Sequence, residues 1–114
     1  MSKYLILLFY LYSSLTVFSQ ELTPEEGKLY SIIMEYRIEH GLPEIPISNA
    51  LTKVAQLHCE DLAKNHPDTG ICNLHSWSNQ GIWSSCCYTD DHAKASCMWD
   101  KPKELSKYQY PGYE

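Results

Sequence analysis

Cysteine and histidine, the side chains best suited to redox chemistry and metal binding, crowd into the second half of this chain. Four of its five cysteines lie between residues 72 and 97, and two of them are adjacent in the stretch WSSCCYTDDH. Their spacing contains no C-x-x-C pair, which a dithiol redox centre or a zinc site normally provides. We therefore predict structural disulfides for Cys72, Cys86, Cys87 and Cys97.

The adjacent cysteines are not expected to bond to each other. A relaxed disulfide needs Cα atoms about 5.5 Å apart, whereas neighbours across a trans peptide are about 3.8 Å apart. Two pairings remain open, 72–86 with 87–97 and 72–87 with 86–97. Either pair of bridges would close loops of about 10–15 residues, and each bridge would contribute roughly 2–3 kcal/mol. The fifth cysteine, Cys59, is predicted to be a free thiol.

Five histidines invite a zinc hypothesis, but their spacing matches no zinc signature, and no G-x-S-x-G or other nucleophile motif is present. His58 lies on a predicted apolar helix face, so we expect a core histidine with one hydrogen bond. His40 is placed where a cation suits a helix C-terminus, and His66 and His92 lie in loops. His75, in CNLHSWS, stands between a predicted disulfide and an aromatic residue, which makes it the best candidate for a site.

The N-terminus has the layout of a secretory signal peptide. Lys3 precedes an unbroken apolar run from Tyr4 to Tyr12, and small polar residues follow. That run is far shorter than the roughly 20 residues that span a bilayer, so no transmembrane anchor is expected. We predict a signal peptide over residues 1–19, cleavage before Gln20, and a secreted protein, which in a bacterium would be periplasmic or at the cell surface.

The remaining residues, 20–114, are predicted to form one small domain at most. A domain of this size buries only about 60–65% of its unfolded surface, so disulfides, which form in exported proteins, would add needed stability. The whole chain has a net charge of −5, and its acidic and basic residues are interspersed without a basic block. Nucleic acid and anionic membranes are therefore not expected as partners.

Three helices are predicted to position these residues. The first begins at Thr23, with Pro24 at its first position and Glu26 completing a capping box, and ends at Gly41 and Pro43. Residues 43–48 contain two prolines and should be extended.

Ser48 then caps a second helix, NALTKVAQLHCEDLAKN. One buried stripe is expected along it, formed by Leu51, Val54, Ala55, His58 and Leu62. From His66 to Trp99 the apolar periodicity disappears, and disulfides are expected to hold a long loop. Asp100 is predicted to cap a short third helix that has Pro102 near its first turn.

The chain also resembles a known family. The segments LTKVAQLHCEDLAKN, CNLHSWS, CCYTDDH, CMWDKPKEL and GYE are similar, in this order, to motifs of the CAP superfamily of SCP-like domains. That superfamily includes cysteine-rich secretory proteins, antigen 5 and plant pathogenesis-related proteins. The resemblance covers about residues 25–114 and is strongest to a bacterial branch with a cysteine-rich insertion.

The resemblance implies an α+β fold, a three-layer α-β-α sandwich of which this chain would hold the N-terminal helices and the disulfide-linked insertion. The family cleft holds a divalent metal such as zinc with two His and two Glu. His75 would be the first of these histidines and Glu114 the first glutamate, while the second pair would lie beyond this sequence. We therefore expect a C-terminally truncated member, with zinc bound only in a longer form.

The function that this resemblance implies is that of an extracellular binding module, not an enzyme, with a lipid, sterol, metal or protein as its ligand. Two alternatives stay open. One is a metal-assisted hydrolase whose site is completed by the missing C-terminal residues, and the other is a structural cysteine-rich protein without a site.

Overall fold

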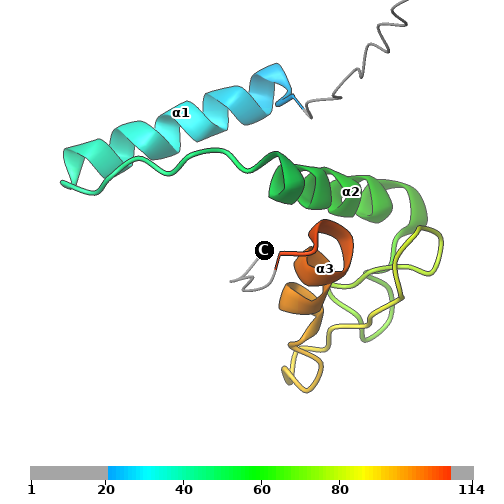
Figure 1. The fold of residues 1–114 in the computed structure, drawn as a ribbon. Coiled ribbons are helices and arrows are strands. Elements are labelled where there is room, and N and C mark those ends of the chain that lie inside the picture. Colours follow the sequence, from blue (N-terminus) through cyan, green and yellow to red (C-terminus); the bar gives the residue numbers. More distant parts are fainter. Residues whose placement is uncertain (1–20, 109–114) are drawn as a thin grey trace, which may run out of the picture.

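A computed structural model describes residues 21–108, which form three helices. These are α1 (Pro24–Glu39), α2 (Asn49–Asn65) and α3 (Cys97–Ser106), shown in Figure 1. The predicted signal peptide, residues 1–19, lies outside the described residues, as does Glu114. Across residues 21–108, the helices are all too short or too polar to cross a membrane.

The start of α1 is fixed by its own first residues, as predicted. The Thr23 hydroxyl accepts a hydrogen bond from the Glu26 N–H at 3.2 Å, and the Glu26 carboxylate accepts one from the Thr23 N–H at 2.7 Å. This reciprocal pair satisfies two of the N–H groups that a helix N-terminus leaves open. At the other end Gly41 has a φ of +67°, a conformation that glycine adopts without strain, and the chain reverses there.

The extended segment, residues 43–48, runs back along α1 after this reversal (Figure 1). Side chains of α1 hold it through its backbone. The Tyr30 hydroxyl donates to the Ile45 carbonyl at 2.7 Å, and the Arg37 Nε–H donates to the Pro43 carbonyl at 2.8 Å. The Ile45 N–H points at the sulfur of Met34, 3.3 Å away. The prediction of an extended conformation is confirmed.

The bounds of α2 agree with the sequence prediction, whereas α3 begins earlier than expected. The Ser48 side chain accepts a hydrogen bond from the Leu51 N–H and caps α2. The predicted cap of the third helix, Asp100, instead lies inside the first turn of α3, and Ser96 stands at the cap position without a side-chain bond. Successive turns over residues 92–99 already supply carbonyls to the following N–H groups, so the helix starts at Cys97.

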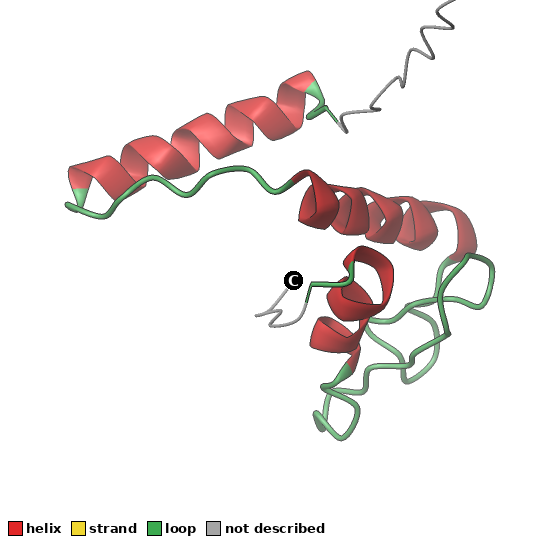
Figure 2. Cartoon of the chain, in the orientation of Figure 1, coloured by secondary structure: helices red, strands yellow, loops and turns green. Residues whose placement is uncertain are grey.

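The cysteine-rich loop, residues 66–96, connects α2 to α3 without regular strands (Figure 2). Two disulfides hold it, Cys72–Cys87 and Cys86–Cys97, which selects one of the two pairings left open by the sequence. Cys59 is a free, exposed thiol, as predicted. The adjacent cysteines bond in different directions, one back to the start of the loop and the other forward to α3.

The predicted α+β, three-layer α-β-α sandwich is wrong for the described part of the chain. Residues 21–108 are mostly helical, and their only β pairing is an isolated antiparallel bridge between Trp77 and Cys86. The physical reason lies in the cysteine-rich loop, whose Gly, Asn, Ser and Asp residues give no alternating apolar pattern from which a sheet could form. Turns, side-chain hydrogen bonds and disulfides take the place of the missing strands.

The core lies where α2, α3 and the cysteine-rich loop meet. Its buried apolar side chains there are Val54, Trp77, Tyr88 and Cys97. Among the described helices, α2 and α3 pack against each other, whereas α1 does not pack along either of them and is linked to α2 by the hydrogen bonds from the Gln56 side chain to Glu26. Only Met34 of α1 is buried, beneath the extended segment. The molecule therefore has a cross-linked core and a more exposed N-terminal arm.

Candidate functional site

The predicted metal residues are not brought together in the described chain. His75 is half-buried in the cysteine-rich loop, where its ring centroid lies 5.1 Å from that of Tyr88. The backbone N–H of His75 donates a hydrogen bond to the Asn73 side chain. Within residues 21–108 there is no group of three or more His, Cys, Asp or Glu side chains arranged to hold a metal. The other predicted ligand, Glu114, lies outside the described residues.

His58 has a packing role, as the sequence predicted. It is half-buried, its ring is stacked on Trp77 with centroids 4.4 Å apart, and its Nε2–H donates to the Ser76 carbonyl at 3.2 Å. Burial lowers its pKa, although the Ser76 carbonyl and the nearby Asp61 carboxylate act in the opposite direction. His58 is therefore neutral at pH 7 and fixes the loop against α2.

Asp61 is the main residue that sequence reasoning missed. It is only 1% exposed, and it accepts hydrogen bonds from the Ser78 N–H at 2.8 Å, the Ser78 hydroxyl at 2.5 Å and the Asn65 side chain at 2.7 Å. Burial raises the pKa of Asp61, but these hydrogen bonds outweigh burial and hold it below its ordinary value. An ionised carboxylate thus ties α2 to the cysteine-rich loop.

A different spacing along α2 would have revealed this residue. Val54, His58 and Asp61 are separated by four and three residues, which places them on one helix face, and that face is the one covered by the loop. Ala55, which we predicted to be buried, is exposed. The buried face of α2 is therefore rotated by a fraction of a helical turn from the predicted stripe, because the prediction rested on apolar residues and left out the buried Asp61.

A second buried charge, Lys101, fastens α3 to the same loop. It is 2% exposed, and its ammonium group donates to the Ser84 carbonyl, to the Ser84 hydroxyl at 2.8 Å and to the Glu104 carboxylate at 2.7 Å. Glu104 in turn accepts from the Ser84 N–H at 2.7 Å. The polar groups of this network hydrogen-bond to one another, which indicates a structural role.

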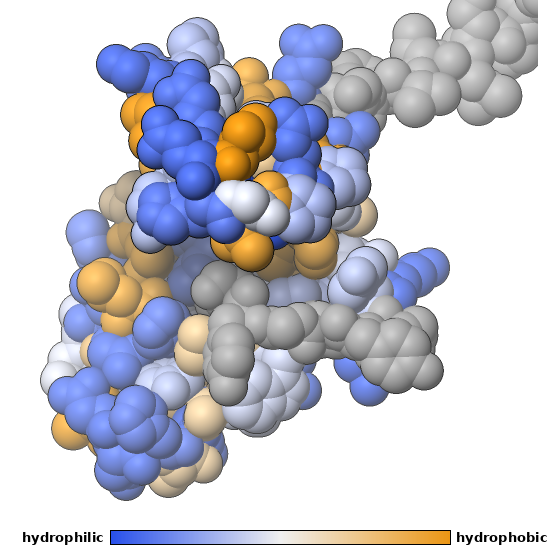
Figure 3. Space-filling model, turned by 90° about the vertical axis from the view of Figure 1, so that its left-hand side faces the viewer, coloured by the Kyte–Doolittle hydropathy of each residue, from blue (hydrophilic) through white to orange (hydrophobic). Residues whose placement is uncertain are grey.

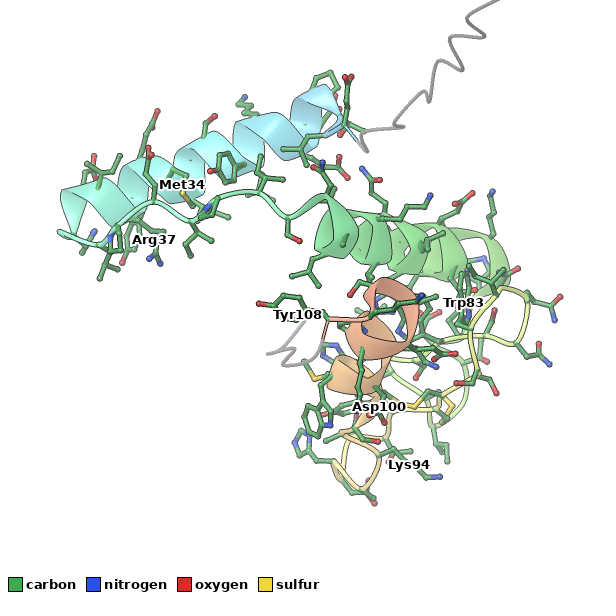
Figure 4. All side chains as sticks on the ribbon, in the orientation of Figure 1. Met34, Arg37, Trp83, Lys94, Asp100 and Tyr108 are labelled. Carbon is green, nitrogen blue, oxygen red and sulfur yellow. A yellow bond between two sulfur atoms is a disulfide. The ribbon has the colours of Figure 1, made fainter. Side chains whose placement is uncertain are left out.

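Among the described residues, a hollow with the character of a ligand site lies between α1, the extended segment and the start of α2. This apolar groove has a volume of about 320 Å³. Figure 4 shows Met34 and Arg37 on the side of α1 that faces the extended segment. The groove is lined by the side chains of Leu22, Glu26, Tyr30, Ile33, Met34, Ile45, Pro46, Ile47, Ser48, Leu51 and Thr52.

The polar groups of the apolar groove are few and lie near one acid. The Glu26 carboxylate accepts hydrogen bonds from the Thr23 N–H and from the Gln56 side chain, at 3.0 and 3.2 Å from the amide nitrogen to the two carboxylate oxygens. The Thr23 backbone and Gln56 together lower the pKa of Glu26. Beyond this carboxylate, the groove offers mainly the hydroxyls of Tyr30, Ser48 and Thr52.

Comparisons with known proteins add no identification. No protein-family model matches the chain, and no curated protein or solved structure shows significant similarity to it.

Proposed function

We propose that this protein is an exported binding module that takes a small apolar ligand in the apolar groove. The observation that carries the proposal is the groove itself. Small-molecule sites are concave, mostly apolar, begin at about 300 Å³ and have a few polar groups that orient the ligand. The groove matches this description in volume and in lining, because eight of its side chains are apolar or aromatic and the other three, Glu26, Ser48 and Thr52, are polar.

Charge at the groove favours a neutral ligand over an anionic one. Because its hydrogen bonds lower the pKa of Glu26, this side chain is ionised at neutral pH. An ionised carboxylate repels the head group of a fatty acid, whereas it can accept a hydrogen bond from a hydroxyl. We therefore propose a neutral lipid-like molecule with a hydroxyl group, such as a long-chain alcohol or a sterol.

Export is the second part of the proposal. The two disulfides support it, because such bonds form and persist in oxidising compartments. The signal-peptide pattern at residues 1–19 and the resemblance to the CAP superfamily point the same way. Members of that superfamily bind sterols, lipids, metals or proteins, so an extracellular module with a lipid-like ligand agrees with membership in it.

Titration with the neutral fluorescent probe N-phenyl-1-naphthylamine tests the site. We expect Ile47→Asp, which places a charge in the groove, to raise the dissociation constant of the probe at least about tenfold. The matched control is Ile82→Asp, because Ile82 is an exposed isoleucine of the cysteine-rich loop that does not line the groove. Equal binding by the two variants would show that the probe binds elsewhere.

Competition then tests the ligand class. Dodecanol should displace the probe from the wild-type protein, and dodecanoate at the same concentration should displace it poorly. Displacement of equal strength by both would contradict the selection against anions while leaving the location of the site intact.

A further inference from the structure

The N-terminal arm, which consists of α1 and the extended segment, holds together as a unit. Hydrogen bonds from Tyr30 and Arg37 fix the extended segment against α1, and Met34 is buried beneath that segment. The arm continues into α2 at Ser48, whereas α1 does not pack along α2 or α3. A change of backbone conformation at Ser48 can therefore turn the whole arm relative to α2 while each part keeps its own contacts.

The apolar groove lies at this joint and draws its walls from both sides. The arm supplies most of the lining, including Tyr30 and Ile45, and the first turn of α2 supplies Leu51 and Thr52. In Figure 3 the arm forms the upper part of the molecule, and apolar side chains are visible on its lower side, where it meets the rest. Turning the arm away from α2 would therefore open the groove and expose any molecule held in it.

The amide side chain of Gln56, on α2, bonds across the joint. Its nitrogen lies 3.0 and 3.2 Å from the two carboxylate oxygens of Glu26 and 3.4 Å from the Glu21 carbonyl oxygen. Gln56 stands one helical turn beyond Thr52, which lines the groove, and Glu26 lines the groove itself. The bridge between the arm and α2 therefore lies at the edge of the groove.

The acceptor of this bridge is fixed by the start of α1. The Glu26 carboxylate also accepts a hydrogen bond from the Thr23 N–H at 2.7 Å, as part of the capping box, so its position does not depend on Gln56. Gln56 is half-buried and donates to a charged group, and a bond of this kind shifts an equilibrium about tenfold. Bonds of this strength keep a joint closed most of the time and still let it open.

We propose that Gln56 is a latch whose bonds to Glu26 keep the arm closed over the apolar groove, and that the arm opens at Ser48 to release the ligand. The release step rests on the function proposed above, whereas the closure of the arm does not. Gln56 does not line the groove, so it acts on the ligand through the position of the arm. The latch would thus set how long a ligand stays bound.

Exchanging the Gln56 amide for charged groups of opposite sign tests the latch. Gln56→Glu removes the donor and places a second carboxylate opposite Glu26, whereas Gln56→Lys keeps a donor there. Gln, Glu and Lys have similar helix propensities, so α2 should form equally in the three proteins, which circular dichroism checks. The matched control is Gln80→Glu, the same exchange at an exposed position of the cysteine-rich loop that does not line the groove.

The position of the arm is measured without any ligand. One spin label is attached to Cys59, the free and exposed thiol of α2, and a second to Lys28→Cys, at an exposed position near the start of α1. Pulsed electron resonance then gives the distribution of distances between the labels. We expect the ratio of long to short distances to rise about tenfold in Gln56→Glu and to stay unchanged in Gln56→Lys and Gln80→Glu. An arm that stays closed in Gln56→Glu would refute the latch.

Stopped-flow release of N-phenyl-1-naphthylamine tests the second half of the proposal. The dissociation rate of this neutral probe should rise about tenfold in Gln56→Glu and stay near the wild-type rate in Gln56→Lys and Gln80→Glu. An arm that opens without faster release would overturn the role of the arm in ligand exit. A wild-type protein that binds no probe would refute the proposed function and the release step with it, while the label distances would still decide whether the latch exists.

Discussion

Replacing Asp61 by alanine should destabilise this protein more than replacing any other acid that hydrogen-bonds to the cysteine-rich loop. The carboxylate is almost completely buried and accepts from one backbone N–H and two side chains. Alanine leaves the Ser78 N–H buried without an acceptor and removes charge-assisted bonds. Each hydrogen bond to a charged group is worth roughly 1.5–3 kcal/mol, so we expect a net loss of about 3 kcal/mol.

The assay is thermal unfolding followed by circular dichroism with the disulfides intact. For a domain of this size, 1 kcal/mol corresponds to a shift of about 4–8 °C, so Asp61→Ala should unfold about 12–24 °C below the wild type. Asp91→Ala is the matched control. Asp91 also accepts from a hydroxyl, that of Thr89 at 2.5 Å, and from a backbone N–H, that of Ala93 at 3.1 Å, but it is exposed.

The control should show no measurable change, because water replaces both partners of an exposed carboxylate. The pH dependence gives a further check with Asp61→Asn. Since the pKa of Asp61 is lowered by folding, the stabilisation it supplies is complete above the ordinary value of about 3.9 and is lost as the pH falls below it. A loss in Asp61→Ala no larger than that in Asp91→Ala would refute the reasoning.

Two other predictions follow from the same contacts. Non-reducing peptide mass spectrometry should recover Cys72 linked to Cys87 and Cys86 linked to Cys97, and peptides joining Cys72 to Cys86 would contradict this pairing. The double variant Cys86→Ser/Cys97→Ser should lose roughly 2–3 kcal/mol of unfolding free energy, measured by urea denaturation. Because burial lowers the pKa of His58 in the folded chain, its unfolded form binds more protons, so stability should fall as the pH drops from 7.5 to 5.5. The urea midpoint of His58→Gln should fall less, and an equal fall in both would contradict this assignment.

Features set by neighbouring residues could be predicted from the sequence. The capping box of Thr23 and Glu26 joins groups three residues apart, and its bonds form whenever the helix forms. The same holds for the Ser48 cap and for the extended conformation imposed by two prolines. The end of α1 at Gly41 is equally local, since only the backbone conformation of that residue decides it.

Features set by distant contacts could not be predicted in this way. The choice between two disulfide pairings depends on the directions in which Cys86 and Cys87 point, which the fold of the loop decides. The burial of Asp61 depends on Ser78, 17 residues away, and polar residues are ordinarily assigned to the surface. The sandwich was predicted from family resemblance alone, and the described residues contain no sheet that could form its middle layer.

The interleaved order of the two disulfides makes the cysteine-rich loop tolerant of peptide-bond cleavage. A cut anywhere between residues 73 and 85 leaves both pieces joined through Cys72–Cys87, and a cut between residues 88 and 96 leaves them joined through Cys86–Cys97. Exposed loop tips such as that at Ile82 are the preferred targets of proteases. A protease that nicks this loop would therefore add one molecule of water to the mass of the protein without releasing a fragment, and α2 and α3 would stay covalently connected.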